Sequence, residues 1–188
     1  GVIGGFIGGV VLRNVILPEL DTVIIMTSNR AEAEAAYGEI WQQAGMMLRQ
    51  GVQFHWENRG FMSFDAMLAS MTHDKRKRIK QDRRYVAEAG VTWRVARGTA
   101  ISDDDWAFFY RCYDGTYRAH LSTPYLSPEF FAHLGHDCGD AAVMFVGERN
   151  GAPICVSLCV ASEDSVYGRY WGTLEQLKSL HFEACYYQ

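Results

Sequence analysis

The spacing of apolar and polar residues changes several times along this chain, and each change marks a predicted element. A short β-branched run over 21–27 is bounded by turn formers and predicts a buried strand. Apolar residues then recur at helical spacing over 30–48, a predicted helix that Gly51 ends. Alternation with a period of two over 52–56 predicts another strand.

A long stretch of helical periodicity opens the second part of the chain. It covers 63–89 and stops at Gly90, a residue type that suits the position after a helix. A strand over 91–95 follows. Ser102 precedes three aspartates, which predicts an N-cap and an acidic first turn for a helix that continues to about Tyr117.

An antiparallel meander is the clearest strand signal. Residues 141–148 and 152–161 predict a hairpin around the Asn-Gly pair at 150–151. A second tight turn leads into a strand over 165–171.

Two further helices flank this meander in the sequence. One is predicted at 127–134, where Pro128 suits the first helical position, and the other begins near Leu180 and continues to 188. The order of elements predicts an α/β chain of the α+β type, with a mainly antiparallel sheet flanked by helices.

Length and charge narrow the function classes. The chain has 188 residues and 48% hydrophobic content, enough for one domain or for one domain plus part of a neighbour, and this excludes a disordered chain. The net charge is −4, but residues 73–84 carry seven Lys or Arg against two Asp. Such a run on a helix is usually a solvated face; the alternative is a nucleic-acid contact, and its candidate residues are Arg76, Lys77, Arg83 and Arg84.

The cysteines and the N-terminal segment indicate the compartment. Five cysteines without a CxxC pair predict neither a disulfide framework nor a metal site, so a reducing cytoplasm is the expected location. The apolar, Gly-rich stretch at the start of the chain is interrupted by Arg13, which is too early for a membrane-spanning helix.

Four segments resemble the GNAT acyltransferase fold and, within it, the Fem-like branch that transfers aminoacyl groups. They are the basic helix 75–84 with the strand start 89–93, the hairpin 146–154, and Tyr-Gly-Arg-Tyr-Trp-Gly at 167–172. Three more strings are similar to signatures of the FemAB-like group, described as peptidoglycan biosynthesis or recognition proteins. These strings are 51–60, 117–125 and 181–188.

The resemblance implies a domain organisation. Proteins of this group are similar to two GNAT-like halves in tandem, so residues 1–20 stay unassigned, 21–60 are the expected tail of a first half, and 61–188 the expected front of a second. The fold would then be incomplete at its C-terminus, because the strand that follows the last helix in the GNAT fold and opens the acyl-donor slot is absent. A fragment of this kind is expected to be inactive.

The resemblance also implies catalytic residues. An amine attacks the carbonyl of the donor, so a base must take the ammonium proton and a backbone N–H must hold the oxyanion. Tyr167 and Arg169 lie on the strand expected to supply that N–H, and alternation predicts that they share one face with Trp171. His55 and Glu57 are the candidates for the base. The alternative is an ordinary solvated strand face.

Substrate binding is expected from residues around the same strand, from the loop near residue 120 and from the last helix. Tyr170 is predicted on the face opposite Trp171. A packed loop, or a carboxylate at the start of a helix, would explain several of these residues equally well. The candidates are Trp56, Tyr117, His120, Tyr125, Tyr170, Trp171, His181, Glu183 and Tyr187.

The implied activity is transfer of an acyl or aminoacyl group to an amine on a small molecule or a peptidoglycan precursor. The resemblance implies no bound cofactor; acyl-coenzyme A or aminoacyl-tRNA would be the co-substrate. The pyrophosphate-loop glycines of GNAT enzymes are absent between Gly172 and His181, so coenzyme A is not assured as donor. The alternative is a non-catalytic recognition module of the same fold that binds a cell-wall glycopeptide or an RNA.

Overall fold

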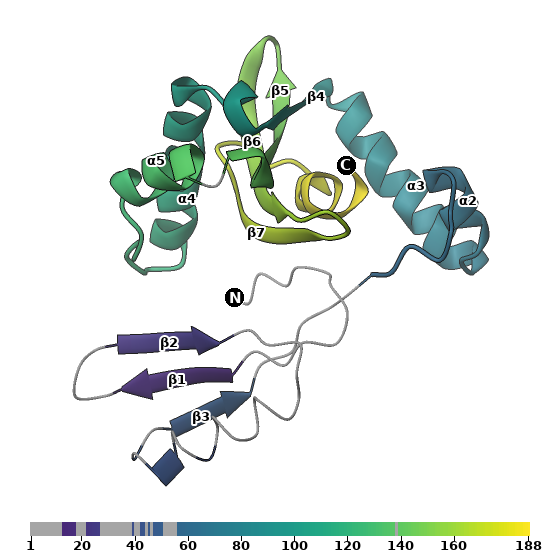
Figure 1. The fold of residues 1–188 in the computed structure, drawn as a ribbon. Coiled ribbons are helices and arrows are strands. Elements are labelled where there is room, and N and C mark those ends of the chain that lie inside the picture. The colour runs from purple at the N-terminus through teal and green to yellow at the C-terminus, as the bar shows by residue number, and fades with distance from the viewer. Residues whose placement is uncertain are drawn as a thin grey trace. The chain divides into compact units, whose positions relative to one another are not determined.

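The computed structural model of this chain divides into two compact units, Gly1–Glu57 and Asn58–Gln188, and each is described by itself. Figure 1 traces the elements in chain order. The residues that the structure describes are 13–17, 22–26, 39, 42–43, 45, 47–50, 56–137 and 139–188.

The first unit contains a three-stranded antiparallel sheet in the order β2-β1-β3. Strand β2, Thr22–Met26, confirms the strand predicted at 21–27. Strand β1, Arg13–Leu17, lies in the segment that the sequence left unassigned.

The end of the helix predicted over 30–48 is wrong. Strand β3, Met47–Gln50, pairs with β1 there, with Met47 opposite Ile16. Met, Leu, Arg and Gln all favour helices, so pairing with a neighbouring strand has overridden local propensity. Residues 52–55 of the strand predicted at 52–56 lie outside the described residues, and Trp56 is not in a strand.

The second unit begins with two helices where one was predicted. Helix α2, Phe64–Ala69, and helix α3, His73–Glu88, are separated by a short turn. The guanidinium of Arg76 donates to three carbonyl oxygens at the end of α2, those of Leu68, Ala69 and Met71, at 3.3–3.4 Å. The helix therefore breaks where a later side chain satisfies its free carbonyls.

The remaining predicted elements of this unit are confirmed, with small changes in their bounds. Two short 3₁₀ segments, η1 (Gly98–Ala100) and η2 (Gly139–Ala141), lie between them. The last predicted helix is α-helical only over its first three residues and continues as the π-helical η3 (Glu183–Tyr187). The helices and strands are β4 (Val91–Arg97), α4 (Asp103–Ala119), α5 (Pro128–Asp137), β5 (Ala142–Arg149), β6 (Ala152–Ala161), β7 (Val166–Thr173) and α6 (Leu180–Phe182).

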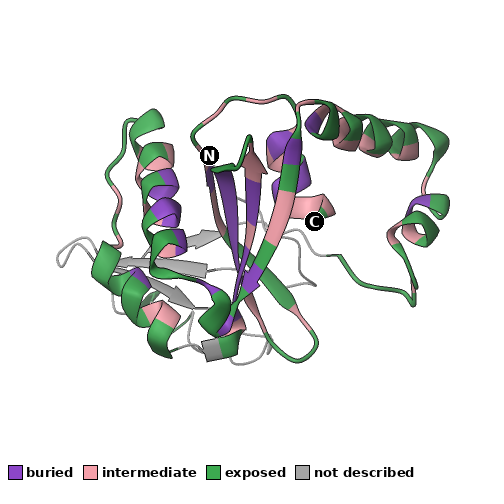
Figure 2. Ribbon diagram, turned by 90° about the horizontal axis from the view of Figure 1, so that it is seen from above, coloured by how far each residue is buried: buried purple, intermediate pink, exposed green. Residues whose placement is uncertain are grey.

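The sheet of this unit is antiparallel throughout, in the order β4-β5-β6-β7. Helices α4 and α5 cover one face, and α3 with α6 lies on the other (Figure 1). Residues 154–159 of β6 are all buried, as expected for a strand covered on both faces (Figure 2). The Asn150-Gly151 turn has φ values of 53° and 77°, which fits the two-residue hairpin predicted from the sequence.

The N-terminus of α4 is fixed by an ion-pair network. Ser102 and Asp105 form a reciprocal capping box, and Arg94 of β4 donates to Asp105 at 2.6 Å and to Glu148 of β5 at 3.0 Å. Burial raises the pKa of Asp105, but the hydrogen bonds from Arg94 and Ser102 outweigh that effect and lower it overall. The helix start is thus tied to two strands.

Strand β7 carries a bulge that the alternation pattern did not predict. Leu158 of β6 pairs with Tyr170 and the next residue, Cys159, pairs with Gly168, so Arg169 is the extra residue. The predicted shared face of Tyr167, Arg169 and Trp171 is therefore wrong. Tyr167 and Tyr170 pair with Val160 and Leu158, which lie two residues apart and face the same way, whereas Trp171 packs on the opposite side.

Helix α4 approaches β7 so closely that only glycine fits at Gly172. A Cβ atom there would lie 2.5 Å from the carbonyl oxygen of Cys112. The hydroxyl of Thr116 reaches the carbonyl of Trp171 in the same contact, at 3.4 Å.

No helix within the described ranges is long and apolar enough to cross a membrane.

We expect Gly172→Ala to lower the free energy of unfolding by about 1–3 kcal/mol, because the added methyl group pushes α4 away from β7. Gly115→Ala is the matched control, since Gly115 lies in α4 and its Cβ would meet nothing within 4 Å. It should raise the free energy of unfolding by about 0.5–1 kcal/mol. Urea denaturation measures both, and equal effects of the two substitutions would contradict the close approach.

Candidate active site on the two faces of strand β7

Four tyrosines from three parts of the second unit meet on the α4 face of the sheet. We call Tyr113, Tyr117, Tyr125 and Tyr170 the tyrosine cluster. The hydroxyls of Tyr125 and Tyr170 are 2.8 Å apart. Ring centroids lie 5.8 Å apart for Tyr117 and Tyr125, 4.8 Å for Tyr113 and Tyr117, and 5.2 Å for Tyr113 and Tyr170.

Local structure explains how these rings are brought together. Tyr113 and Tyr117 are four residues apart in α4 and therefore lie on one helix face. The chain then turns back, with the amide of Ser122 donating to the carbonyl of Tyr117 at 3.0 Å, and carries Tyr125 to its partner on β7. Phe131 of α5 closes the base of the cluster, 5.1 Å from Tyr113.

The surroundings of Tyr117 and Tyr170 favour their protonated forms. Burial raises the pKa of Tyr170, and its hydrogen bond with Tyr125 raises it further. Burial likewise raises the pKa of Tyr117, with added repulsion from Tyr125. At neutral pH these groups can donate hydrogen bonds, and they are poor bases.

Trp171 and His181 form a second group on the opposite face of β7. Their ring centroids lie 4.8 Å apart, and the rings of Phe182 and Tyr186 are within 6 Å of the imidazole. Burial lowers the pKa of His181. The imidazole is therefore neutral at pH 7 and has a free lone pair, which a proton acceptor needs.

Glu183 links η3 to α3 through a hydrogen bond from Arg83. Its side chain is buried; one carboxylate oxygen accepts from Arg83 at 3.1 Å and from Gln188 at 2.5 Å. The guanidinium of Arg83 also lies 4.6 Å from the ring of Phe64, whose edge meets Tyr187. The contacts of Glu183 and Tyr187 thus join α2, α3 and η3.

The four basic residues predicted for nucleic-acid contact differ in their surroundings. Arg76 donates hydrogen bonds to the end of α2, and Arg83 donates one to Glu183. Arg84 pairs with Glu88 at 3.7 Å on the exposed surface of the same helix, and Lys77 is exposed. One side of α3 carries a basic stripe with a shallow hollow along it. The residues that line the hollow are His73, Arg76, Lys77, Lys80, Gln81 and Arg84.

The remaining predicted catalytic residues and Trp56 differ in what the structure shows of them. His55 lies outside the described residues. Trp56 and Glu57 are exposed and belong to the first unit, so the structure does not place them against β7. Arg169 is exposed, with its guanidinium 5.7 Å from the ring of Tyr170.

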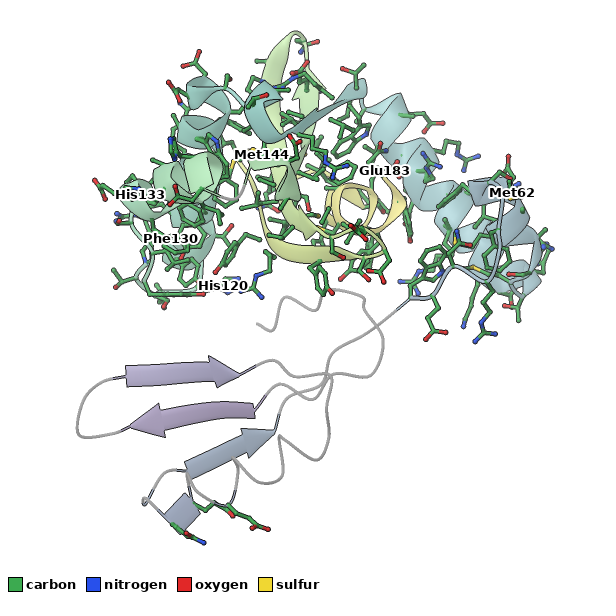
Figure 3. The ribbon with its side chains drawn as sticks, in the orientation of Figure 1. Met62, His120, Phe130, His133, Met144 and Glu183 are labelled. Carbon is green, nitrogen blue, oxygen red and sulfur yellow. The ribbon has the colours of Figure 1, made fainter. Side chains whose placement is uncertain are left out.

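Of two further residues in or beside α4, the sequence predicted His120 and missed Tyr113. His120, a predicted contact, is exposed at the C-cap of α4, on the side of the sheet away from Glu183 (Figure 3). Tyr113 was not predicted, although its spacing from Tyr117 was a usable signal. Within the part of the chain that the structure describes, no three His, Cys, Asp or Glu residues are grouped to hold a metal ion.

A protein-family model matches most of the chain. The model of the FemAB-like family, described as peptidoglycan biosynthesis/recognition, matches residues 25–188. No curated protein matches the chain.

We expect Arg83→Ala to cost roughly 2–4 kcal/mol of unfolding free energy, because it leaves the buried carboxylate of Glu183 without its cation. Lys77→Ala, on the exposed surface of the same helix, should change it by less than about 0.5 kcal/mol. Thermal and urea unfolding of both variants measure the difference. Equal losses would show that Arg83 does not brace the helix.

The tyrosine cluster should make the protein lose stability in alkali. Because the pKa of Tyr170 is raised in the folded state, this contribution is complete below the unfolded pKa of about 10 and is lost as pH rises through the folded pKa. Urea unfolding between pH 8 and 11 should show a slope that Tyr170→Phe reduces by up to about 1.4 kcal/mol per pH unit. An unchanged slope in this variant would contradict the assignment, and pH 6–8 serves as the internal reference.

Proposed function

This chain belongs to the FemAB-like family, and on that premise we propose that it is a transferase that moves an acyl or aminoacyl group onto an amine of a peptidoglycan precursor. The family match covers residues 25–188 and its description names peptidoglycan biosynthesis or recognition. That match is the observation that carries the proposal.

The surroundings of β7 support an acyl-transfer site. Within the described residues no strand pairs with the outer edge of β7, so backbone groups there can face a ligand. Protonated tyrosine hydroxyls lie on one face of that strand and a neutral imidazole on the other. Backbone N–H donors for a developing oxyanion lie at the edge of β7, and His181 beside the same strand is an acceptor for a proton.

The proposed reaction needs no covalent intermediate. The amine lone pair attacks the carbonyl carbon of the donor, a C–N bond forms, and the leaving group departs with the electrons of its bond. The proton released from nitrogen passes to His181, whose lowered pKa keeps it unprotonated at neutral pH. A backbone N–H at the outer edge of β7 holds the negative charge on the oxygen, because the Tyr170 hydroxyl lies on the face of the sheet opposite Trp171 and His181.

The donor is either an acyl-coenzyme A or an aminoacyl-tRNA. The exposed basic stripe of α3 favours the tRNA, because phosphates bind clustered Lys and Arg. Arg76 and Arg83 have structural contacts, so Lys77 and Arg84 are the better candidates for this contact.

The test uses the protein expressed in its complete natural reading frame. It is incubated with a muramyl-pentapeptide precursor and either acetyl-coenzyme A or charged tRNA, and mass spectrometry follows the precursor. We expect a mass increase of one acyl or aminoacyl group, and none when the precursor amine has been blocked by acetylation. His181→Gln should lower the rate by at least about a hundredfold with little change in precursor binding.

Tight binding of the precursor without a product from either donor would refute transfer. That result would favour the recognition module of the same fold.

A further inference from the structure

Leu121 combines an unfavourable backbone conformation with an exposed apolar side chain. The amides of Leu121 and Ser122 donate to the carbonyls of Arg118 and Tyr117 at 3.0 Å, a pattern that ends a helix with one left-handed residue. Leu121 is that residue, with φ at 55°, where glycine is usual. Its side chain is 98% exposed and so gains nothing from burial.

A strained and exposed apolar residue on a loop indicates a contact with something outside the chain. Leu121 follows Tyr117 by one turn, and the ring of Tyr117 packs on that of Tyr125. Tyr125 is 63% exposed, yet its hydroxyl is held by Tyr170. Leu121 and Tyr125 thus lie four residues apart on one loop, both with exposed side chains, and the hydroxyl of Tyr125 is one of the fixed pair.

We propose that Leu121, Tyr125 and Tyr170 form a subsite for a sugar ring of the peptidoglycan glycan. A pyranose ring has an apolar C–H face bordered by hydroxyl and acetamido groups. A tyrosine offers the same combination, an apolar ring with a polar tip, and the hydroxyl pair can both donate and accept hydrogen bonds.

A peptide stem or an acyl chain fits this subsite less well. The hydroxyl pair of Tyr125 and Tyr170 is uncharged, so it offers a carboxylate or ammonium group of a stem peptide no opposite charge; the guanidinium of Arg169 lies against the ring of Tyr170, at 5.7 Å, and is no part of this pair. An acyl chain would leave both hydroxyls without a ligand atom to bond. The proposal rests on the proposed function, since the family match supplies the glycan as ligand class.

The subsite is tested by binding, which does not require transfer. The probe is the disaccharide N-acetylglucosaminyl-N-acetylmuramic acid without peptide, and the comparison ligand is the free stem pentapeptide; calorimetry measures both. We expect the disaccharide alone to bind. Tyr125→Ala should weaken it about tenfold or more and Tyr125→Phe less, while Tyr85→Ala, a tyrosine of α3, should leave it unchanged.

Leu121→Gly distinguishes an effect on disaccharide binding from an effect on the stability of the fold. It should raise the melting temperature by roughly 2 °C by relieving the left-handed leucine, and still weaken disaccharide binding several-fold. Unchanged binding in Leu121→Gly and Tyr125→Ala, or binding of the stem pentapeptide alone, would overturn the glycan subsite.

Failure of the two proposals can be told apart. Transfer to the precursor without disaccharide binding would refute only the subsite. Disaccharide binding that depends on Leu121 and Tyr125, without transfer from either donor, would refute only the transferase.

Discussion

The close contact between α4 and β7 at Gly172 is the constraint on which the arrangement of the second unit depends. A helix backbone that lies against a strand backbone fixes where the side chains on either side of the contact must point. Tyr113 and Tyr117 are carried toward Tyr170 by this approach, and the hydroxyl of Thr116 reinforces it at the carbonyl of Trp171. The tyrosine cluster is thus a consequence of helix packing as much as of its own hydrogen bonds.

The candidate site consists of two chemically different groups that share one strand. Adjacent residues of β7, Tyr170 and Trp171, point to opposite faces. The raised pKa of Tyr170 keeps its hydroxyl protonated, and the lowered pKa of His181 leaves one nitrogen of its imidazole without a proton at neutral pH. Acyl transfer to an amine needs a proton acceptor such as His181, and the proposed sugar subsite would hold the glycan of the acceptor at the tyrosine cluster, on the other face of the same strand.

Much of the second unit could be predicted from its sequence because local signals agree with the packing. The Asn-Gly hairpin, the Ser102 cap and Gly90 after α3 are each determined by a few neighbouring residues. Tertiary contacts explain the elements whose structure differs from the prediction. Pairing with β1 made a strand of Met47–Gln50, Arg76 divided the first helix, and an inserted residue in β7 reversed the predicted faces. The roles of Glu183 and Arg83 also needed the structure, because they are 100 residues apart in the chain.

The bulge at Arg169 has a consequence for how copies of the protein meet. An outer strand with regular spacing offers its unpaired backbone groups to any extended segment and so promotes aggregation. An extra residue breaks that spacing and increases the local twist, and the exposed guanidinium of Arg169 adds a charge at the same point. The bulge therefore discourages the edge of one sheet from pairing with the edge of another, while the backbone groups of β7 remain accessible to a small ligand.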